Sequence, residues 1–346
     1  MIYRQEEVTF TNTAADIILA GTLTIPDNQK PIATVLLIAG HGPHTRGTAQ
    51  GPRKRFFLLA DHLTKNGLAV LRYDKRGIGQ STGNYDIATS RDFADDALAA
   101  IEYLKTRTDL GENNICVVGH SEGGMIATMI AAESKDISLV VSMAGVVQLD
   151  TKGLVLQDEL QMRADGASKE LITRDNIIRT QFYTIVRQQP HADTAQQQLH
   201  EIFQQYWKQL PEELKVESND VTSAFNENNI DSFIDLFNGA WFRYFLTCKP
   251  EKFLARIKIP LLALYGDKDW IVSSKIALPI IDRVLRAAGN NDYTLIELPD
   301  LNHSFQQCVT GSSEEYETLK ESLAPEFLSA LTEWIVRKSN KQCMKL

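Results

Sequence analysis

The sequence predicts an α/β fold with a mostly parallel, twisted sheet that is covered by helices on both faces. Apolar strand runs alternate with helical patterns through residues 1–149 and again through 246–346. Such alternation with short links is typical of a parallel sheet between two layers of helices. Residues 150–245 contain no apolar strand run and read as several helices. We therefore expect one α/β domain, formed by 1–149 and 246–346, with a helical cap inserted at 150–245.

The first part of the chain reads as a hairpin followed by alternating strands and helices. Strand-like alternation at 6–25 turns near 12–16 and stops at Pro26, which predicts an antiparallel hairpin. The run 33–39 is continuously apolar, as expected of a strand buried on both faces. The elements expected next are a helix at 56–65, a strand at 68–73, a helix at 90–107 that Ser90 can cap, and strands at 115–119 and 139–143.

Strands and helices alternate again after the predicted cap. The elements expected there are a strand at 260–265, a helix at 274–288, a strand at 293–298 and a closing helix at 324–339. Within the cap, apolar residues recur at helical spacing from Ile230 to Phe245, which predicts one helix with a wide apolar stripe.

Composition excludes several classes of function. The 346 residues carry a net charge of −8, and Lys and Arg are scattered, which argues against binding to nucleic acid or to an anionic membrane surface. The four cysteines share no short spacing, so neither a metal site nor a redox CxxC is expected. Cys116, inside a strand, is expected to be a buried apolar residue. The oligomeric state is left open by the sequence.

Localisation follows from the N-terminal residues and from hydropathy. The start of the chain is polar, and no apolar run reaches 18 residues. The chain as written therefore predicts a cytoplasmic protein, or a secreted or periplasmic one if a signal peptide has been removed.

The most informative stretch is Ile115–Gly124, Ile-Cys-Val-Val-Gly-His-Ser-Glu-Gly-Gly, where an apolar strand passes through a tight turn into a helix. Gly119-x-Ser121-x-Gly123 has the spacing of a nucleophile elbow. A serine in so sharp a turn has a strained backbone, so the residues two before and two after it must lack bulk. The helix that follows aims its free N–H groups at the serine oxygen. The side chains of His120 and Glu122 are assigned no chemistry.

A nucleophilic serine needs a base and a carboxylate that orients the base. These partners are expected in loops at the carboxyl ends of later strands. The loop after 261–265 offers Asp267 and Asp269, and both remain open as the acid. The loop after 293–298 contains His303, the single histidine beyond residue 200.

An oxyanion hole needs two converging N–H donors. Glu122, next to the serine, supplies one through its backbone, and the loop after 33–39 should supply the second. Pro43 has no N–H, so we expect His41, with Gly42 as the alternative. A metal site at His41 and His44 is disfavoured because no carboxylate or cysteine stands at ligand spacing. Asp74 and Arg76 are expected to pair and to fix the loop beside the site.

Five segments carry a resemblance to the α/β-hydrolase superfamily, and more narrowly to bacterial serine esterases and the related prolyl-oligopeptidase-like (S9-type) and S33-type hydrolases. They are Gly40-His41-Gly42-Pro43 with Arg46, the run 72–81, the run 119–124, Gly266-x-x-Asp269-x-x-Val272, and Leu301-Asn302-His303. The resemblance implies an α/β-hydrolase fold and places the acid on Asp269. The family's first segment more often reads Gly-Ser-Gly-Pro with an acidic residue before the Arg, so the role of Arg46 here is left open.

The sequence therefore predicts a serine hydrolase that cleaves small carboxylic esters with Ser121, His303 and Asp269, without a cofactor or metal. Trp241 and Tyr244, near the end of the apolar stripe, are expected to bind the acyl part of the substrate. A peptidase or amidase is the second interpretation, for which Glu159, Asp165 and Glu170 could bind a substrate amino group. A thioesterase or acyltransferase is third. A binding protein on a hydrolase scaffold is disfavoured because every catalytic position is filled.

Overall fold

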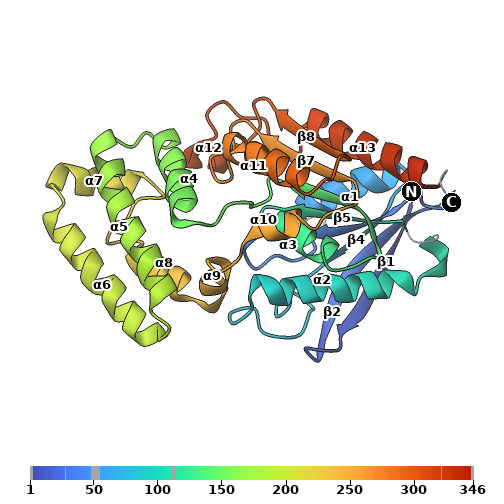
Figure 1. Ribbon diagram of the computed structural model, residues 1–346, viewed down its shortest axis with the longest axis horizontal. Coiled ribbons are helices and arrows are strands. Elements are labelled where there is room, and N and C mark those ends of the chain that lie inside the picture. Colours follow the sequence, from blue (N-terminus) through green and yellow to red (C-terminus); the bar gives the residue numbers. More distant parts are fainter. Residues whose placement is uncertain (1–2, 28, 48–54, 111–113, 321, 344–346) are drawn as a thin grey trace.

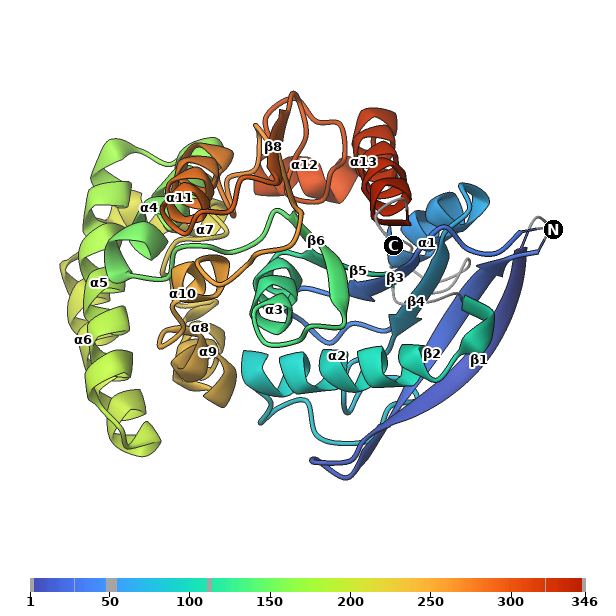
Figure 2. The same cartoon turned by 45° about the vertical axis from the view of Figure 1, so that its right-hand side comes forward.

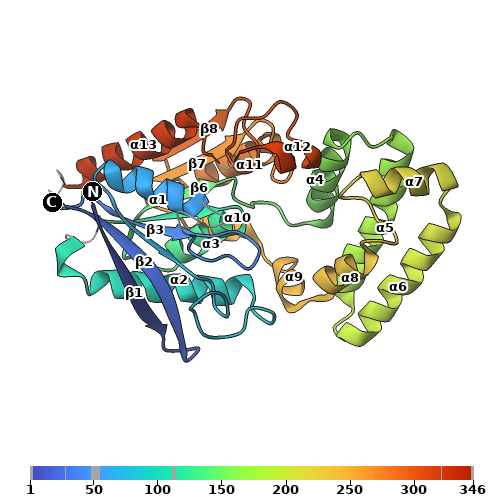
Figure 3. The same cartoon turned by 180° about the vertical axis from the view of Figure 1, so that it is seen from behind.

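A computed structural model describes residues 3–27, 29–47, 55–110, 114–320 and 322–343. It has two parts, a sheet packed between helices and a group of helices to one side of it (Figure 1). The helical group is formed by residues between β6 and β7, and α5, α6 and α7 lie farthest from the sheet (Figure 3). A helical segment is thus present where the sequence predicts an insertion.

The sheet of the described residues has eight strands in the order β1-β2-β4-β3-β5-β6-β7-β8. β1 and β2 form an antiparallel hairpin, β2 pairs antiparallel with β4, and all later pairs are parallel. The fold class predicted from the sequence is therefore confirmed. The strands are β1 (Tyr3–Asn12), β2 (Ile17–Pro26), β3 (Thr34–Ile38), β4 (Ala69–Tyr73), β5 (Ile115–His120), β6 (Ile137–Met143), β7 (Leu261–Gly266) and β8 (Tyr293–Leu298).

Helices cover both faces of this sheet (Figure 2). On one face α1 (Arg55–Lys65) packs against α13 (Pro325–Cys343). On the other, α3 (Glu122–Ala131) packs between α2 (Ser90–Lys105) and α10 (Pro250–Leu254), and α10 contacts α11 (Ser274–Ala287). Every residue of β3 and β5 is buried, Cys116 included, because both faces of these central strands are covered.

Some short elements were not expected from the sequence. They are the 3₁₀ turn η1 (Thr108–Leu110), α10, and α12 (Ser313–Thr318), each too short to give a periodic signal. The N-cap of α2 is Thr89, which forms a capping box with Asp92, and not Ser90. The Ser90 hydroxyl donates instead to Glu122 Oε1.

The predicted single helix over the apolar stripe is wrong. The segment forms two helices, α8 (Ile230–Asn238) and α9 (Ala240–Phe245), which are separated at Gly239 in an extended conformation. Arg243 Nε donates to the carbonyl oxygen of Asn238, which compensates for the helical bond that this carbonyl lacks. The other helices of the insertion are α4 (Thr151–Ala164), α5 (Lys169–Gln188), α6 (Ala192–Gln209) and α7 (Glu212–Asp220).

The predicted pair between Asp74 and Arg76 is also wrong. Buried Asp74 accepts hydrogen bonds from the backbone N–H of Arg46 (2.7 Å) and from its Nη1 (2.6 Å). Arg76 instead pairs with Asp96 of α2, with 2.7 Å between Nη2 and Oδ1. The two side chains point in different directions. Asp74 connects the loop after β4 to the 44–47 segment, and Arg76 connects the same loop to α2. This pairing gives Arg46 the role that the sequence left open.

The Arg76–Asp96 pair allows a stability test with a matched control on the next residue. Asp96 is buried and also accepts from Asn12 Nδ2 at 2.9 Å, so Asp96→Asn removes the buried partner of the Arg76 cation and leaves only its pair with the partly exposed Asp92. We expect the free energy of unfolding to fall by about 3 kcal/mol. Asp95→Asn, which removes a half-exposed pair with Arg91, should cost at most about 1 kcal/mol. Urea unfolding of both variants measures the difference, and equal losses would contradict it.

Candidate active site

Ser121 occupies a sharp turn between β5 and α3, and its backbone has φ 57° and ψ −122°. A positive φ is strained for a residue with a side chain. The turn closes only because its neighbours are glycines: a Cβ on Gly119 would lie 1.9 Å from the Gly123 carbonyl oxygen, and one on Gly123 would lie 2.2 Å from that of Ile38. The steric requirement inferred from the sequence is thus present in the structure.

Asp269 and His303 are hydrogen-bonded to each other at the carboxyl ends of β7 and β8. His303 Nδ1 lies 2.8 Å from Asp269 Oδ2. The other oxygen, Oδ1, accepts from the backbone N–H groups of Ile271 (3.0 Å) and Val272 (2.8 Å). Asp269 is 1% exposed, so one oxygen is fixed by the backbone and the other is left for the imidazole. The structure brings Asp269, and not Asp267, to His303.

His120 links the loop of His303 to the turn of Ser121. Its Nε2 lies 2.7 Å from the carbonyl oxygen of His303, and the two rings are 4.7 Å apart between centroids. Desolvation lowers the pKa of His120 well below its usual value, so the neutral ring donates to that carbonyl. The backbone N–H of His303 donates in turn to the Tyr316 hydroxyl (2.9 Å). Within the described residues the Ser121 hydroxyl has no hydrogen-bond partner, as is common before substrate binds.

The loop after β3 lies against Ser121. A Cβ on Gly40 would be 3.0 Å from Ser121 Cβ and 3.6 Å from its Oγ. The Gly42 N–H already donates to the Tyr85 hydroxyl at 3.1 Å. The N–H groups of His41 and Glu122, in contrast, donate to no acceptor in the described part of the chain. These two donors are therefore free to bind an oxyanion, and Gly42, the alternative donor, is engaged elsewhere.

The Glu122 side chain is the feature of the site that sequence reasoning missed. Its carboxylate is 1% exposed, and Oε1 accepts from Ser90 Oγ (2.6 Å) and from Trp241 Nε1 (2.7 Å). Oε2 lies 3.5 Å from the buried ammonium of Lys75. Burial lowers the pKa of Lys75, and the Glu122 charge acts in the opposite direction. The available signal was the position of Glu122, an acidic residue at the start of an otherwise apolar helix.

Trp241 and Tyr244, both of α9, lie in different surroundings. The Trp241 ring packs on the His41 ring, 3.8 Å between centroids, and on Phe245 at 4.7 Å. Desolvation lowers the pKa of His41. Tyr244 instead lies beside Cys248, and burial raises the pKa of Tyr244 to about 12. The structure thus brings Trp241 to the site, whereas the described contacts of Tyr244 do not include Ser121, Asp269 or His303.

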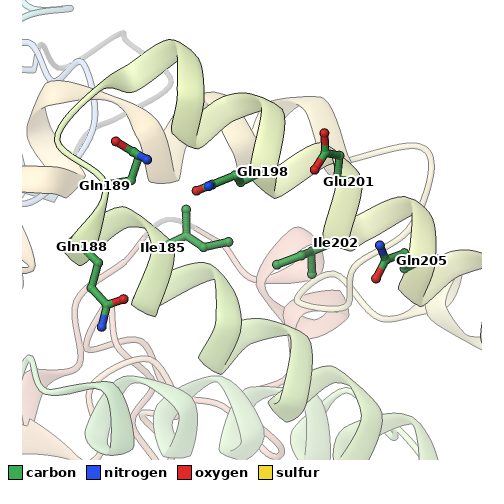
Figure 4. A pocket seen from close by; sticks show the side chains of 7 residues that line it. All are labelled: Ile185, Gln188, Gln189, Gln198, Glu201, Ile202 and Gln205. Atoms are coloured by element: carbon green, nitrogen blue, oxygen red, sulfur yellow. The ribbon is translucent and has the colours of Figure 1, made fainter.

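A separate groove lies in the insertion between α5 and α6 (Figure 4). Its volume is about 450 Å³, and it is lined by Ile185, Gln188, Gln189, Gln198, Glu201, Ile202 and Gln205. Its lining has no serine, cysteine or histidine, so it lacks a nucleophile–base pair for ester cleavage and is not the candidate active site.

The described residues contain no group of three or more His, Cys, Asp or Glu side chains placed to hold a metal ion. None of the described helices is both long and apolar enough to cross a lipid bilayer.

Residues 47–306 match the model of a family described as alpha/beta hydrolase fold. The chain is 24% identical over 324 residues to the Thermotoga maritima esterase EstD. The matched region covers 92% of this chain and 66% of EstD, so the chain spans just under two thirds of that relative's length.

Two solved structures resemble the chain over most of its length. An esterase of Pyrococcus furiosus has a TM-score of 0.56 at 18% identity, and the match covers 97% of this chain and 92% of that one. A proline iminopeptidase of Mycobacterium smegmatis has a TM-score of 0.57 at 15% identity, covering 97% and 100%. At these identities the likeness shows the fold alone.

The geometry predicts which residue reacts with a fluorophosphonate probe. We expect mass spectrometry to find the label on Ser121 and Ser121→Ala to abolish it. Asp269→Asn should slow labelling by roughly 10⁴-fold, because the wrong imidazole tautomer faces the serine. Asp267→Asn, two residues away in the same loop, is the matched control and should label near the wild-type rate. Labelling of another serine would contradict the assignment.

Proposed function

The chain belongs to the alpha/beta hydrolase fold family, and from this premise we propose that it is a serine esterase that cleaves small carboxylic esters through an acyl-enzyme intermediate. The observation that supports the proposal most is the bond between His303 Nδ1 and the buried carboxylate of Asp269. That bond leaves the opposite nitrogen, Nε2, available to a serine. The strained turn of Ser121 supplies that serine on the neighbouring strand end.

In the proposed mechanism, Ser121 Oγ attacks the ester carbonyl while His303 Nε2 takes its proton. Asp269 holds the imidazole in the required tautomer and stabilises the imidazolium that forms. The N–H groups of Glu122 and His41 bind the oxyanion of the tetrahedral intermediate. His303 then gives its proton to the leaving alcohol. Water activated by the same histidine hydrolyses the acyl-enzyme, and no cofactor takes part.

The insertion 150–245 acts in this proposal as a cap over the site. Its α9 contacts α2 of the sheet domain, and Trp241 reaches the loop of His41. We assign Trp241 to the acyl-binding wall. Tyr244, predicted to share this role, is left out of the acyl-binding wall, because its described contacts do not include Ser121, Asp269 or His303.

A peptidase would need a free acidic group for a substrate amine, and the three cap carboxylates considered for it are engaged. Glu159 pairs with Arg163 and accepts from Asn176. Asp165 accepts from the Ser313 backbone and hydroxyl. Glu170 pairs with Arg174 one turn along α5. These pairings favour the esterase over the peptidase.

The proposal is tested by a substrate screen. We expect hydrolysis of p-nitrophenyl esters and little or no hydrolysis of aminoacyl-anilides of matched size. Ser121→Ala should reduce kcat for the esters by roughly 10⁴- to 10⁶-fold. Faster cleavage of the anilides would establish the peptidase instead, and ester turnover that survives Ser121→Ala would refute the mechanism.

The proposed cap predicts different effects for two aromatic residues of the 230–245 segment, Phe233 and Trp241. Phe233 packs on Phe225 and Phe237 inside the insertion, so Phe233→Ala should cost about 3–5 kcal/mol of stability and leave the preference for acyl length unchanged. Trp241→Ala should change the preference for acyl length. The discrimination between esters that differ by one methylene should change by roughly 1–3 kcal/mol of transition-state free energy. The loss of the Trp241–Glu122 bond adds a stability cost. Values of kcat/KM across an ester series and thermal melts check both variants, and an unchanged profile in Trp241→Ala would remove it from the acyl-binding wall.

A further inference from the structure

We propose that Lys75 is a positioning residue that orients one donor of the oxyanion hole; the inference rests on the proposed function. Lys75 Nζ donates to the carbonyl oxygen of Gly40 at 2.6 Å, and the ammonium is buried. This carbonyl belongs to the same peptide group as the N–H of His41. A trans peptide is planar, and its C=O and N–H point in opposite directions. Fixing the oxygen of Gly40 therefore fixes the direction of the His41 N–H.

This peptide is placed where its orientation matters. Its Gly40 lies so close to the nucleophile that an added Cβ would be 3.6 Å from Ser121 Oγ. If the peptide were flipped, a carbonyl oxygen would face the developing oxyanion, and electrostatic repulsion would replace the hydrogen bond. The Lys75 bond opposes that flip, because a charge-assisted hydrogen bond in a buried site is costly to break.

The ammonium is itself held in place from two other sides. It lies 4.0 Å from the centroid of the Phe93 ring, in cation–π contact, and 3.5 Å from Glu122 Oε2. Among the described residues, Glu122 is the carboxylate within ion-pair distance of Lys75. Glu122 thus serves the site twice: its N–H is one proposed donor, and its carboxylate holds the cation that orients the other.

The cap completes this arrangement through Trp241. Its Nε1–H donates to Glu122 Oε1, while its ring packs on His41, the residue whose N–H is being oriented. Ser90 Oγ donates to the same Glu122 oxygen from α2. The Glu122 carboxylate therefore joins the cap, α2 and, through Lys75, the oxyanion loop.

The test replaces the ion pair by neutral groups, so that no unpaired charge is buried. In Lys75→Met/Glu122→Gln, the Met keeps the length of the apolar stem, and the Gln carbonyl still accepts from Ser90 and Trp241. Removing a buried pair in this way is often neutral for stability, so the variant should fold. We expect kcat to fall roughly 100-fold with little change in KM, because the oxyanion exists only in the transition state. Affinity for a trifluoromethyl ketone, which binds as an oxyanion adduct, should fall in parallel.

Tyr85→Phe is the matched control. It removes the hydroxyl that accepts the Gly42 N–H, one residue further along the same loop, and leaves the Gly40–His41 peptide in place. Its kcat should stay near the wild-type value. A general loosening of the loop would instead lower kcat in both variants, which would overturn the specific role of Lys75.

Further measurements separate the remaining outcomes. Wild-type kcat in a folded double variant would overturn the proposal.

If the double variant does not fold, Lys75→Arg is the alternative variant. It keeps the positive charge but displaces the donor, so it should lower kcat without raising KM. An unchanged kcat in Lys75→Arg would overturn the proposal. If the wild-type protein hydrolyses no ester, the proposed function fails. In that case a crystal structure of the double variant tests the role of Lys75 separately. An unchanged orientation of the Gly40–His41 peptide would contradict that role.

Discussion

The structure of the site depends on the close contact between Gly119 and Gly123. With no side chain on either residue, β5 can turn directly into α3 and hold Ser121 at φ 57°. The strain of that turn is maintained by the packing around it, since β5 and most of α3 are completely buried in the sheet domain. A bulkier residue at either glycine would push α3 away from the sheet, and α3 also carries the N–H of Glu122. The position of the proposed nucleophile and the position of a proposed oxyanion donor are therefore set by one steric constraint.

Buried charge forms a second layer around that turn. Asp269 is hydrogen-bonded to His303, Asp74 pairs with Arg46, Asp96 pairs with Arg76, and Glu122 pairs with Lys75. Each of these contacts joins a loop at the carboxyl end of the sheet to a neighbour that is distant in sequence. Buried polar groups stabilise a fold only when they are satisfied, so these contacts restrict the loops to one arrangement. A pre-organised site is the expected consequence, because its dipoles need no reorientation during the reaction.

The sequence predicted the fold class and the strands well, because β3, β5 and β7 are apolar runs whose burial can be read directly from composition. It also placed Ser121, Asp269 and His303 in loops that the structure brings together. The prediction of an Asp74–Arg76 pair failed, because each of these side chains pairs with a residue that is distant in sequence. No local pattern reveals such partners. The sequence joined α8 and α9 into one helix because apolar spacing continues through Gly239, where the glycine ends the helix. The role of Glu122 depends on Ser90, Lys75 and Trp241, which only the tertiary structure brings together.

The proposed mechanism depends above all on a covalent acyl-enzyme at Ser121. The most direct measurement is rapid-quench mass spectrometry of the protein mixed with excess p-nitrophenyl acetate. We expect a burst of about one p-nitrophenolate per chain, with an acetyl group on the peptide that contains Ser121. Steady turnover with no acetylated peptide, or acetylation at another residue that accounts for the burst, would contradict it.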